Sequence, residues 1–275
     1  MDGEEGKQYD DFGEGTLLFS PDSKRVVYGA LVGKKWCMVV DGKEEKQYNG
    51  IGEGLLFSPD SRRVAYGAKA GKKWCVVVDG EEGRHYDGIR EGSLLFSPDS
   101  RRVAHAAKAG KKWCMVVDGE EGKQYDGIRV GLLFSPDSRR VAYAAKAGKK
   151  WCMVVDGEEG KHYDDFGEGT LLFSPDSKRV AYGALVGKKW CMVVDGKEEK
   201  QYDGIWEGLL FSPDSRRVAY AAKAGKKCCV VVDGEEGKKY DGIVKGGTII
   251  FDSPDSLHYL AWKGNEIYLV EERIE

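Results

Sequence analysis

The chain has 275 residues, of which 41% are hydrophobic and 32% are charged, and its formal net charge is −3. This slight acidic excess argues against nucleic acid as a partner, because phosphate backbones select basic surfaces. No apolar run approaches the roughly 18 residues needed to cross a bilayer, and the acidic start is unlike a secretory signal. We therefore expect a folded, cytoplasmic protein with no membrane partner.

One short motif recurs along the whole chain. Phe-Ser-Pro-Asp-Ser begins at six positions, and a variant with an extra Asp begins at a seventh: Phe19, Phe57, Phe96, Phe134, Phe173, Phe211 and Phe251. The first six are on average 38.4 residues apart. A fixed period of this length predicts repeated units that depend on their neighbours, so we expect a single domain over residues 1–275.

Each repeat contains four segments rich in strand-forming residues, with turn signals between them. In residues 208–243 these segments are 209–211, 218–222, 228–232 and a short one around Tyr240. The first is followed by Ser212-Pro213-Asp214-Ser215, in which proline and the flanking polar residues suit a type I turn. Four antiparallel strands joined by tight turns predict one blade of a β-propeller.

The two ends of the chain complete the count of strands. The last repeat supplies strands over 248–251, 258–262 and 267–270 and then ends without a fourth, whereas Lys7–Asp10 copies the fourth strand of the other repeats. We therefore predict an all-β fold, a seven-bladed β-propeller of four-stranded antiparallel blades, closed by the N-terminal strand in the last blade. The predicted blades span about 16–51, 54–89, 93–128, 131–166, 170–205, 208–243, and 247–275 with 7–12.

The hairpin sequence Phe-Ser-Pro-Asp-Ser-Arg-Arg-Val-Ala-Tyr, as in residues 57–66, resembles the WD-like repeats of TolB-type propellers. The resemblance covers essentially the whole chain. Similar repeats also build the propeller domains of prolyl-oligopeptidase-type and tricorn-type peptidases, so the resemblance implies architecture rather than activity. The third strand reads Trp-Cys-Met-Val-Val-Asp-Gly instead of carrying a Trp-Asp pair, and the partners of WD repeats are therefore not transferred.

The seven cysteines raise the question of a metal site or disulfides. Five of them follow a tryptophan at one equivalent strand position, and no Cys-x-x-Cys spacing typical of zinc sites is present. Equivalent positions in neighbouring blades are too far apart for bridging. We therefore expect buried, reduced cysteines with a structural role, no metal and no cofactor, in agreement with a cytoplasmic location.

The acidic turns and the histidines do not form a catalytic or metal-binding pattern. The Asp-Gly-Glu-Glu-Gly turns lack the spacing of an EF-hand loop. There is no Gly-x-Ser-x-Gly motif, and His105 stands where other repeats have tyrosine, while His85 and His162 stand where others have Gln or Lys. We predict no catalytic residue and interpret these histidines as ordinary substitutions.

The copies differ most in the loop that follows the fourth strand. Residues 2–89 and 156–243 differ at only 8 of 88 positions, so this variation stands out against near identity. Arg and Trp are frequent anchors of protein interfaces. The predicted protein-binding face consists of Arg90, Arg129 and Trp206 together with Glu53, Glu91 and Glu207.

These observations favour a non-catalytic scaffold that binds a protein or peptide on one loop face, acts as a monomer, and arose by recent amplification of its repeats. The alternative is an enzyme with an active site in the channel, or the propeller domain of a larger peptidase-like protein. An enzyme requires a cluster of His, Asp, Glu or Arg that is not repeated from blade to blade, whereas a scaffold shows equivalents everywhere. A third possibility is a product of amplification that has no refined site.

Overall fold

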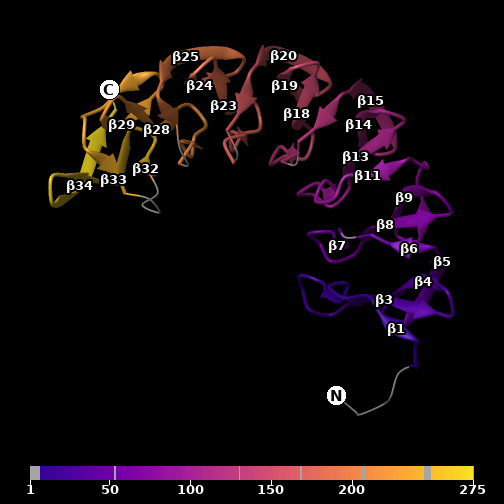
Figure 1. Ribbon diagram of the computed structural model, residues 1–275. Coiled ribbons are helices and arrows are strands. Elements are labelled where there is room, and N and C mark those ends of the chain that lie inside the picture. Colours follow the sequence, from indigo (N-terminus) through magenta and orange to yellow (C-terminus); the bar gives the residue numbers. More distant parts are fainter. Residues whose placement is uncertain are drawn as a thin grey trace. The chain divides into compact units, whose positions relative to one another are not determined.

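The computed structural model describes residues 7–52, 54–129, 131–167, 169–205, 208–244 and 249–274, and these residues form strands and turns without any helix. Accordingly, the described residues include no helix able to cross a membrane. The chain divides into two compact units, residues 1–132 and 133–275. In each unit the sheets follow one another in chain order (Figure 1).

The first unit contains three complete sheets. Sheet 1 consists of β1 (Asp11–Phe12), β2 (Leu18–Phe19), β3 (Val26–Val32), β4 (Lys35–Val40) and β5 (Lys43–Tyr48). Sheet 2 consists of β6 (Gly50–Ile51), β7 (Leu56–Phe57), β8 (Val64–Ala70), β9 (Lys73–Val78) and β10 (Glu81–Glu82). Sheet 3 consists of β11 (Gly88–Ile89), β12 (Leu95–Phe96), β13 (Val103–Ala109), β14 (Lys112–Val117) and β15 (Glu120–Tyr125), and β16 (Gly127–Ile128) is the last strand of the unit.

The second unit continues the series to sheet 7. Sheet 4 contains β17 (Leu133–Phe134), β18 (Val141–Ala147), β19 (Lys150–Val155) and β20 (Glu158–Tyr163). Sheet 5 contains β21 (Asp165–Phe166), β22 (Leu172–Phe173), β23 (Val180–Val186), β24 (Lys189–Val194) and β25 (Lys197–Tyr202). Sheet 6 contains β26 (Gly204–Ile205), β27 (Leu210–Phe211), β28 (Val218–Ala224), β29 (Lys227–Val232) and β30 (Glu235–Glu236), and sheet 7 contains β31 (Gly242–Ile243), β32 (Ile250–Ser253), β33 (Ser256–Lys263) and β34 (Glu266–Arg273).

The first strand of each sheet is interrupted, which the sequence did not predict. In sheet 2, Ile51 of β6 pairs with Ala68 of β8, while Phe57 of β7 pairs with Val64 further along the same strand. The two short strands therefore lie end to end and fill one strand position. Counted in this way, the sheets have four antiparallel positions, and the seven sheets are the blades of a seven-bladed β-propeller.

The interruption is bridged in two ways that alternate along the chain. The gap before Phe19, Phe96 and Phe173 contains one residue more than the gap before Phe57, Phe134 and Phe211, and this residue is a Thr or Ser. In sheet 1 the hydroxyl of Thr16 accepts a hydrogen bond from the backbone N–H of Gly29 at 2.9 Å and donates to the carbonyl of Gly13 at 2.6 Å. The extra side chain therefore pairs a donor of β3 that neither short strand reaches.

Within each unit, an arginine after the turn links one sheet to the next. In sheet 2, Arg63 Nε donates to Asp79 Oδ2 at 2.8 Å, and its Nη1 donates to the carbonyl of Arg101 in sheet 3 at 2.8 Å. The same guanidinium lies 5.3 Å from the centre of the Phe96 ring. We call this arrangement the arginine latch, and Arg25 and Arg179 repeat it between other neighbouring sheets of the same unit.

The hydrophobic core lies between consecutive sheets rather than inside any one of them. Val27, Met38 and Tyr48 of sheet 1 pack against Tyr66 and Val77 of sheet 2, and all five are at most 1% exposed. Alternating side chains of a strand point to opposite faces, so an interior blade buries both faces against its neighbours. Each blade therefore depends on the next one for its stability.

The two terminal sheets show what happens without such a neighbour in the same unit. Phe19 of sheet 1 is 59% exposed, whereas its equivalent Phe57 in sheet 2 is 7% exposed. In sheet 7, Leu269 is 62% exposed. Residues 7–10, the predicted seventh copy of the fourth strand, place Tyr9 edge-on against Tyr28 at 6.1 Å, as Tyr48 packs on Tyr66. The closure of the last blade by this segment and the single domain remain predictions.

Substitution of the latch arginine tests its role. Arg63→Ala removes an ion pair, two hydrogen bonds to backbone carbonyls and a cation–π contact, so we expect a loss of about 2–4 kcal/mol in unfolding free energy. The matched control is Arg62→Ala, because the Arg62 side chain is 85% exposed and should cost at most about 0.5 kcal/mol. Equal denaturant midpoints for the two variants would contradict the role of the latch.

Removal of the N-terminal segment tests the predicted closure. A chain lacking residues 1–12 should aggregate or dimerise, because an unpaired strand edge remains in the last blade. Deletion of residues 2–6 alone keeps Lys7–Asp10 and serves as the control. Size-exclusion chromatography with light scattering measures the outcome, and a stable monomer from the longer deletion would refute closure.

Candidate functional site

The predicted binding face is described at three of its six residues. Arg90 follows β11, Glu91 follows Arg90, and Arg129 follows β16, so the two arginines occupy separate loops of the first unit. Glu91 is exposed, and both arginines are half-buried. Glu53, Trp206 and Glu207 lie outside the described residues.

Arg90 is held in place by an aromatic ring. Its guanidinium lies 5.9 Å from the centre of the Trp113 ring, and Lys108 lies at the same distance from that ring. The Nε atom of Arg90 is buried and has no hydrogen-bond partner. A stacked arginine loses little further freedom when it binds a carboxylate, which makes it a suitable anchor.

The same loop position covers the tryptophan in sheet 2 as well. There the residue is Gly52, and a Cβ atom at this position would lie 2.9 Å from the ring of Trp74. The differences among the copies at this position therefore change what lies against the tryptophan of the third strand. Part of the variation that sequence comparison identified has a packing cause.

A cavity of about 580 Å³ lies between sheets 2 and 3, and sequence analysis missed it. Its walls come from β9, β10, β13 and β14 and include Tyr86, His105 and Arg84. At the equivalent junction between sheets 1 and 2, the hydroxyl of Tyr66 donates to Glu45 at 2.5 Å and fills this space. Gly83 and His105 replace that pair here, so both side chains are smaller and a space opens.

His105 is the buried polar group of this cavity. It is 7% exposed, and neither ring nitrogen has a hydrogen-bond partner. Burial lowers its pKa to about 4, so the imidazole is neutral at pH 7. A buried group without a partner reduces stability and offers a hydrogen bond to any ligand that enters.

The charged residues around the cavity are mostly paired with one another. Arg63 pairs with Asp79 and Arg102 with Asp118, both at 2.8 Å, and both pairs belong to the repeated framework. Arg84 pairs with Glu121 at 3.0 Å. Among the described residues that line the cavity, none is Ser, Thr, Cys or Lys, so His105 has no such nucleophile beside it to activate.

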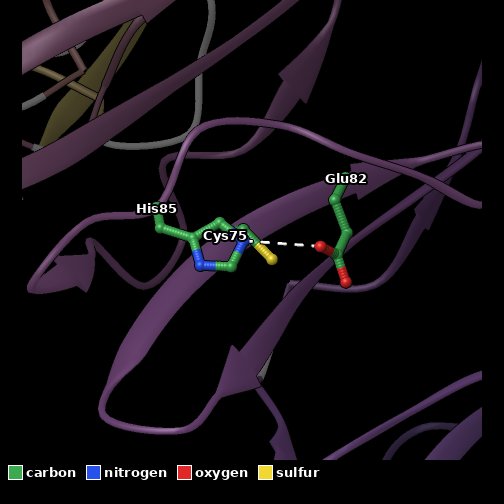
Figure 2. Close-up of side chains that lie close together, drawn as sticks. All are labelled: Cys75, Glu82 and His85. Atoms are coloured by element: carbon green, nitrogen blue, oxygen red, sulfur yellow. Dashed lines mark hydrogen bonds and ion pairs between the residues drawn. The ribbon is translucent and has the colours of Figure 1, made fainter.

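A second cluster lies on β9 and β10 and the residues that follow them. The thiol of Cys75 in β9, the carboxylate of Glu82 in β10 and the imidazole of His85 have ligand atoms within 4.8 Å of one another. Figure 2 shows the three side chains converging, with His85 Nε2 3.4 Å from Glu82 Oε2. Cys152, Glu159 and His162 form an equivalent cluster in the second unit.

All seven cysteines are buried and unbridged. Burial raises the pKa of Cys75 to about 11, so its thiol is protonated at neutral pH. The sequence interpretation considered the spacing between cysteines and therefore did not connect Cys75 with a histidine ten residues away. The signal was the two substitutions of Gln or Lys by His85 and His162, each ten residues after a cysteine.

Comparisons with known proteins show the fold and no more. No family model matches the chain, and no curated protein matches it. A solved structure of a eukaryotic initiation factor is 14% identical, with a TM-score of 0.50, and the match covers 94% of this chain and 78% of that one. This likeness is one of fold alone.

Other similar structures include propellers named in the sequence analysis. TolB from Acinetobacter baumannii is 16% identical with a TM-score of 0.37, over 80% of this chain, and the match spans 61% of TolB. The β-propeller domain of the Trilobed protease from Pyrococcus furiosus is 16% identical with a TM-score of 0.39, over 94% of this chain and 97% of that one. The repeated sheets themselves, with the likeness in fold to the initiation factor, make the chain a β-propeller protein.

Replacement of His105 by tyrosine tests the origin of the cavity. His105→Tyr restores the residue that the other repeats have. Gly160 of sheet 4 is equivalent to Gly83, and it lies close to Tyr182, the tyrosine equivalent to His105: a Cβ on Gly160 would be 3.5 Å from the Tyr182 hydroxyl. A glycine and a tyrosine are therefore compatible at these two positions. We expect a gain of about 1–3 kcal/mol at pH 7, because a buried group without partners is removed.

The same variant should change the dependence of stability on pH. The pKa of His105 is about 4 in the folded protein and 6.5 in the unfolded chain. The free energy of unfolding therefore has its full value above pH 6.5 and decreases as the pH falls toward 4, because the unfolded chain then binds a proton that the folded protein does not. Between pH 7.0 and 4.5 the loss amounts to about 2 kcal/mol and should be absent from His105→Tyr. Urea unfolding at pH 7.0 and 4.5 measures it, and parallel pH profiles for both proteins would contradict the burial of a neutral imidazole.

Proposed function

We propose that this protein is a non-catalytic module that binds a protein or peptide through the loop containing Arg90. The observation that supports this function is the stacked guanidinium on Trp113, which presents a fixed cation in the loop where the copies differ most. Its chemistry suits an acidic segment, because arginine can bind a carboxylate through two parallel hydrogen bonds. Arg129, which follows β16, adds a second cation in the next loop.

The absence of catalysis is part of the proposal. The recurring ionic side chains have a framework role: the latch arginines bind the next turn, and Lys73 and Lys112 pair with Asp87 and Asp126. Among the described residues, the cavity at His105 is a departure from the repeat that favours the alternative of an enzyme. A neutral histidine between paired charges supports ligand binding better than it supports hydrolysis.

We also propose that the protein is a cytoplasmic monomer. Seven cysteines, all reduced in the structure, agree with a reducing compartment. The alternative that the chain is the propeller domain of a larger peptidase-like protein is compatible with the same module, since it assigns binding to the propeller and catalysis elsewhere.

Substitution at Arg90 tests the function. Peptides selected from a displayed random library should be rich in Asp and Glu, and Arg90→Gly should weaken their binding at least tenfold. Glycine is the native residue at Gly13, Gly52 and Gly167, so the substitution is compatible with the fold. Arg62→Ala removes an equal charge from an exposed turn and should leave the dissociation constant within twofold.

Two results would refute the proposal. One is selection of no peptide above background, or equal binding by Arg90→Gly and the native chain. The other is turnover of a panel of ester, phosphate and peptide substrates that His105→Tyr abolishes, because that result would establish the enzymatic alternative.

A further inference from the structure

The cluster of Cys75, Glu82 and His85 arises from an irregularity in strand pairing. Trp74 forms a bridge with Tyr86, and Val77 pairs with Glu82, so three steps along β9 correspond to four steps on the opposing segment. In the second unit the register is explicit: Cys152 pairs with His162 and Val154 with Glu159, with a bulge between. A bulge re-aims one side chain, and here it brings the glutamate to the face that carries the cysteine and the histidine.

The three side chains supply sulfur, nitrogen and oxygen ligands. Thiolate and imidazole select zinc over magnesium and calcium, which prefer oxygen alone. Ligand atoms around tetrahedral zinc are about 3.5 Å apart, given bonds of about 2.0–2.3 Å. The distance of 3.4 Å between Glu82 Oε2 and His85 Nε2 already meets this value. The ligand atoms of the three residues all lie within 4.8 Å of one another, so a movement of about 1 Å by the exposed His85 side chain brings them to the spacing that zinc requires.

The glutamate has an oxygen available for such an ion. Its Oε1 lies 2.8 Å from Lys46 Nζ, whereas its Oε2 faces His85. Hydrogen bonding to Lys46 holds the pKa of Glu82 below its ordinary value, so the carboxylate is ionised at neutral pH. Tyr48 and His85 lower the pKa of this carboxyl further.

The other sheets provide the comparison. Cysteine and glutamate recur at these positions as Cys37 and Glu44, Cys114 and Glu121, Cys191 and Glu198, and Cys229 and Glu236. The residue at the place of His85 is Gln47, Gln124, Gln201 or Lys239 in those sheets. Only the histidine adds a third ligand to the recurring pair, and it does so once in each unit.

We propose that Cys75, Glu82 and His85 bind a zinc ion, and that Cys152, Glu159 and His162 form a second site of the same kind. Three protein ligands leave one position for water or for an external ligand. Binding requires loss of the thiol proton, so the affinity increases with pH between 6 and 8. The sites are independent of the peptide-binding function proposed above.

Equilibrium dialysis against zinc, with metal content measured by mass spectrometry, tests the proposal on the whole chain. The native protein should bind two zinc ions, His85→Gln and His162→Gln one each, and the double variant none, with at least a tenfold loss of affinity at each altered site. Glutamine is native at the same position in three sheets, so these variants should unfold at the midpoint of the native protein.

Cobalt(II) distinguishes the complete sites from adventitious binding to exposed histidines. Native protein loaded with cobalt should show a thiolate-to-metal charge-transfer band, and Cys75→Ser with Cys152→Ser should lose the band together with at least tenfold in affinity. The proposal is overturned if the double histidine variant binds as much zinc as the native chain. It is also overturned if cobalt binds without the charge-transfer band.

Discussion

The arginine latch is the interaction on which the rest of this structure depends. A four-stranded blade cannot bury both its faces alone, and the guanidinium joins it to the turn of the next blade. Arg63 does this by satisfying carbonyls of the neighbouring turn while it covers the ring of Phe96. The turn motif is therefore a connector between blades as much as a hairpin, which explains why the copies keep Ser, Pro, Asp and Arg together.

The cavity at His105 and the cysteine clusters depend on this regular framework. Gly83 and His105 leave a space because both neighbouring sheets are held at the usual separation and cannot collapse onto it. The histidines of the two clusters likewise lie beside a cysteine and a glutamate that recur at the same positions of other blades. Small substitutions in a repeated scaffold can thus produce local chemistry without any change of fold.

The fold was predictable from the sequence to a greater extent than the candidate sites. Periodic motifs such as Phe57-Ser58-Pro59-Asp60 determine strand and turn positions locally, so the number of blades followed directly. The interrupted first strand and the bulge beside Cys75 depend on pairing between segments, which no local pattern reports. The sequence identified His105 as an exception but could not place it in one cavity with Gly83, because the two residues come from different sheets.

The extra Thr or Ser in every second gap shows that the sequence repeats every two blades as well as every blade. Equivalent phenylalanines two blades apart, such as Phe19 and Phe96 or Phe57 and Phe134, are separated by 77 residues, which is half of the 154-residue offset between the near-identical segments. The repeating unit of the sequence is thus a pair of unlike blades, one with the extra hydroxyl residue and one without it. Seven blades cannot be divided into such pairs, and the blade left over is sheet 7, whose strands β32, β33 and β34 differ most in length from those of the other sheets.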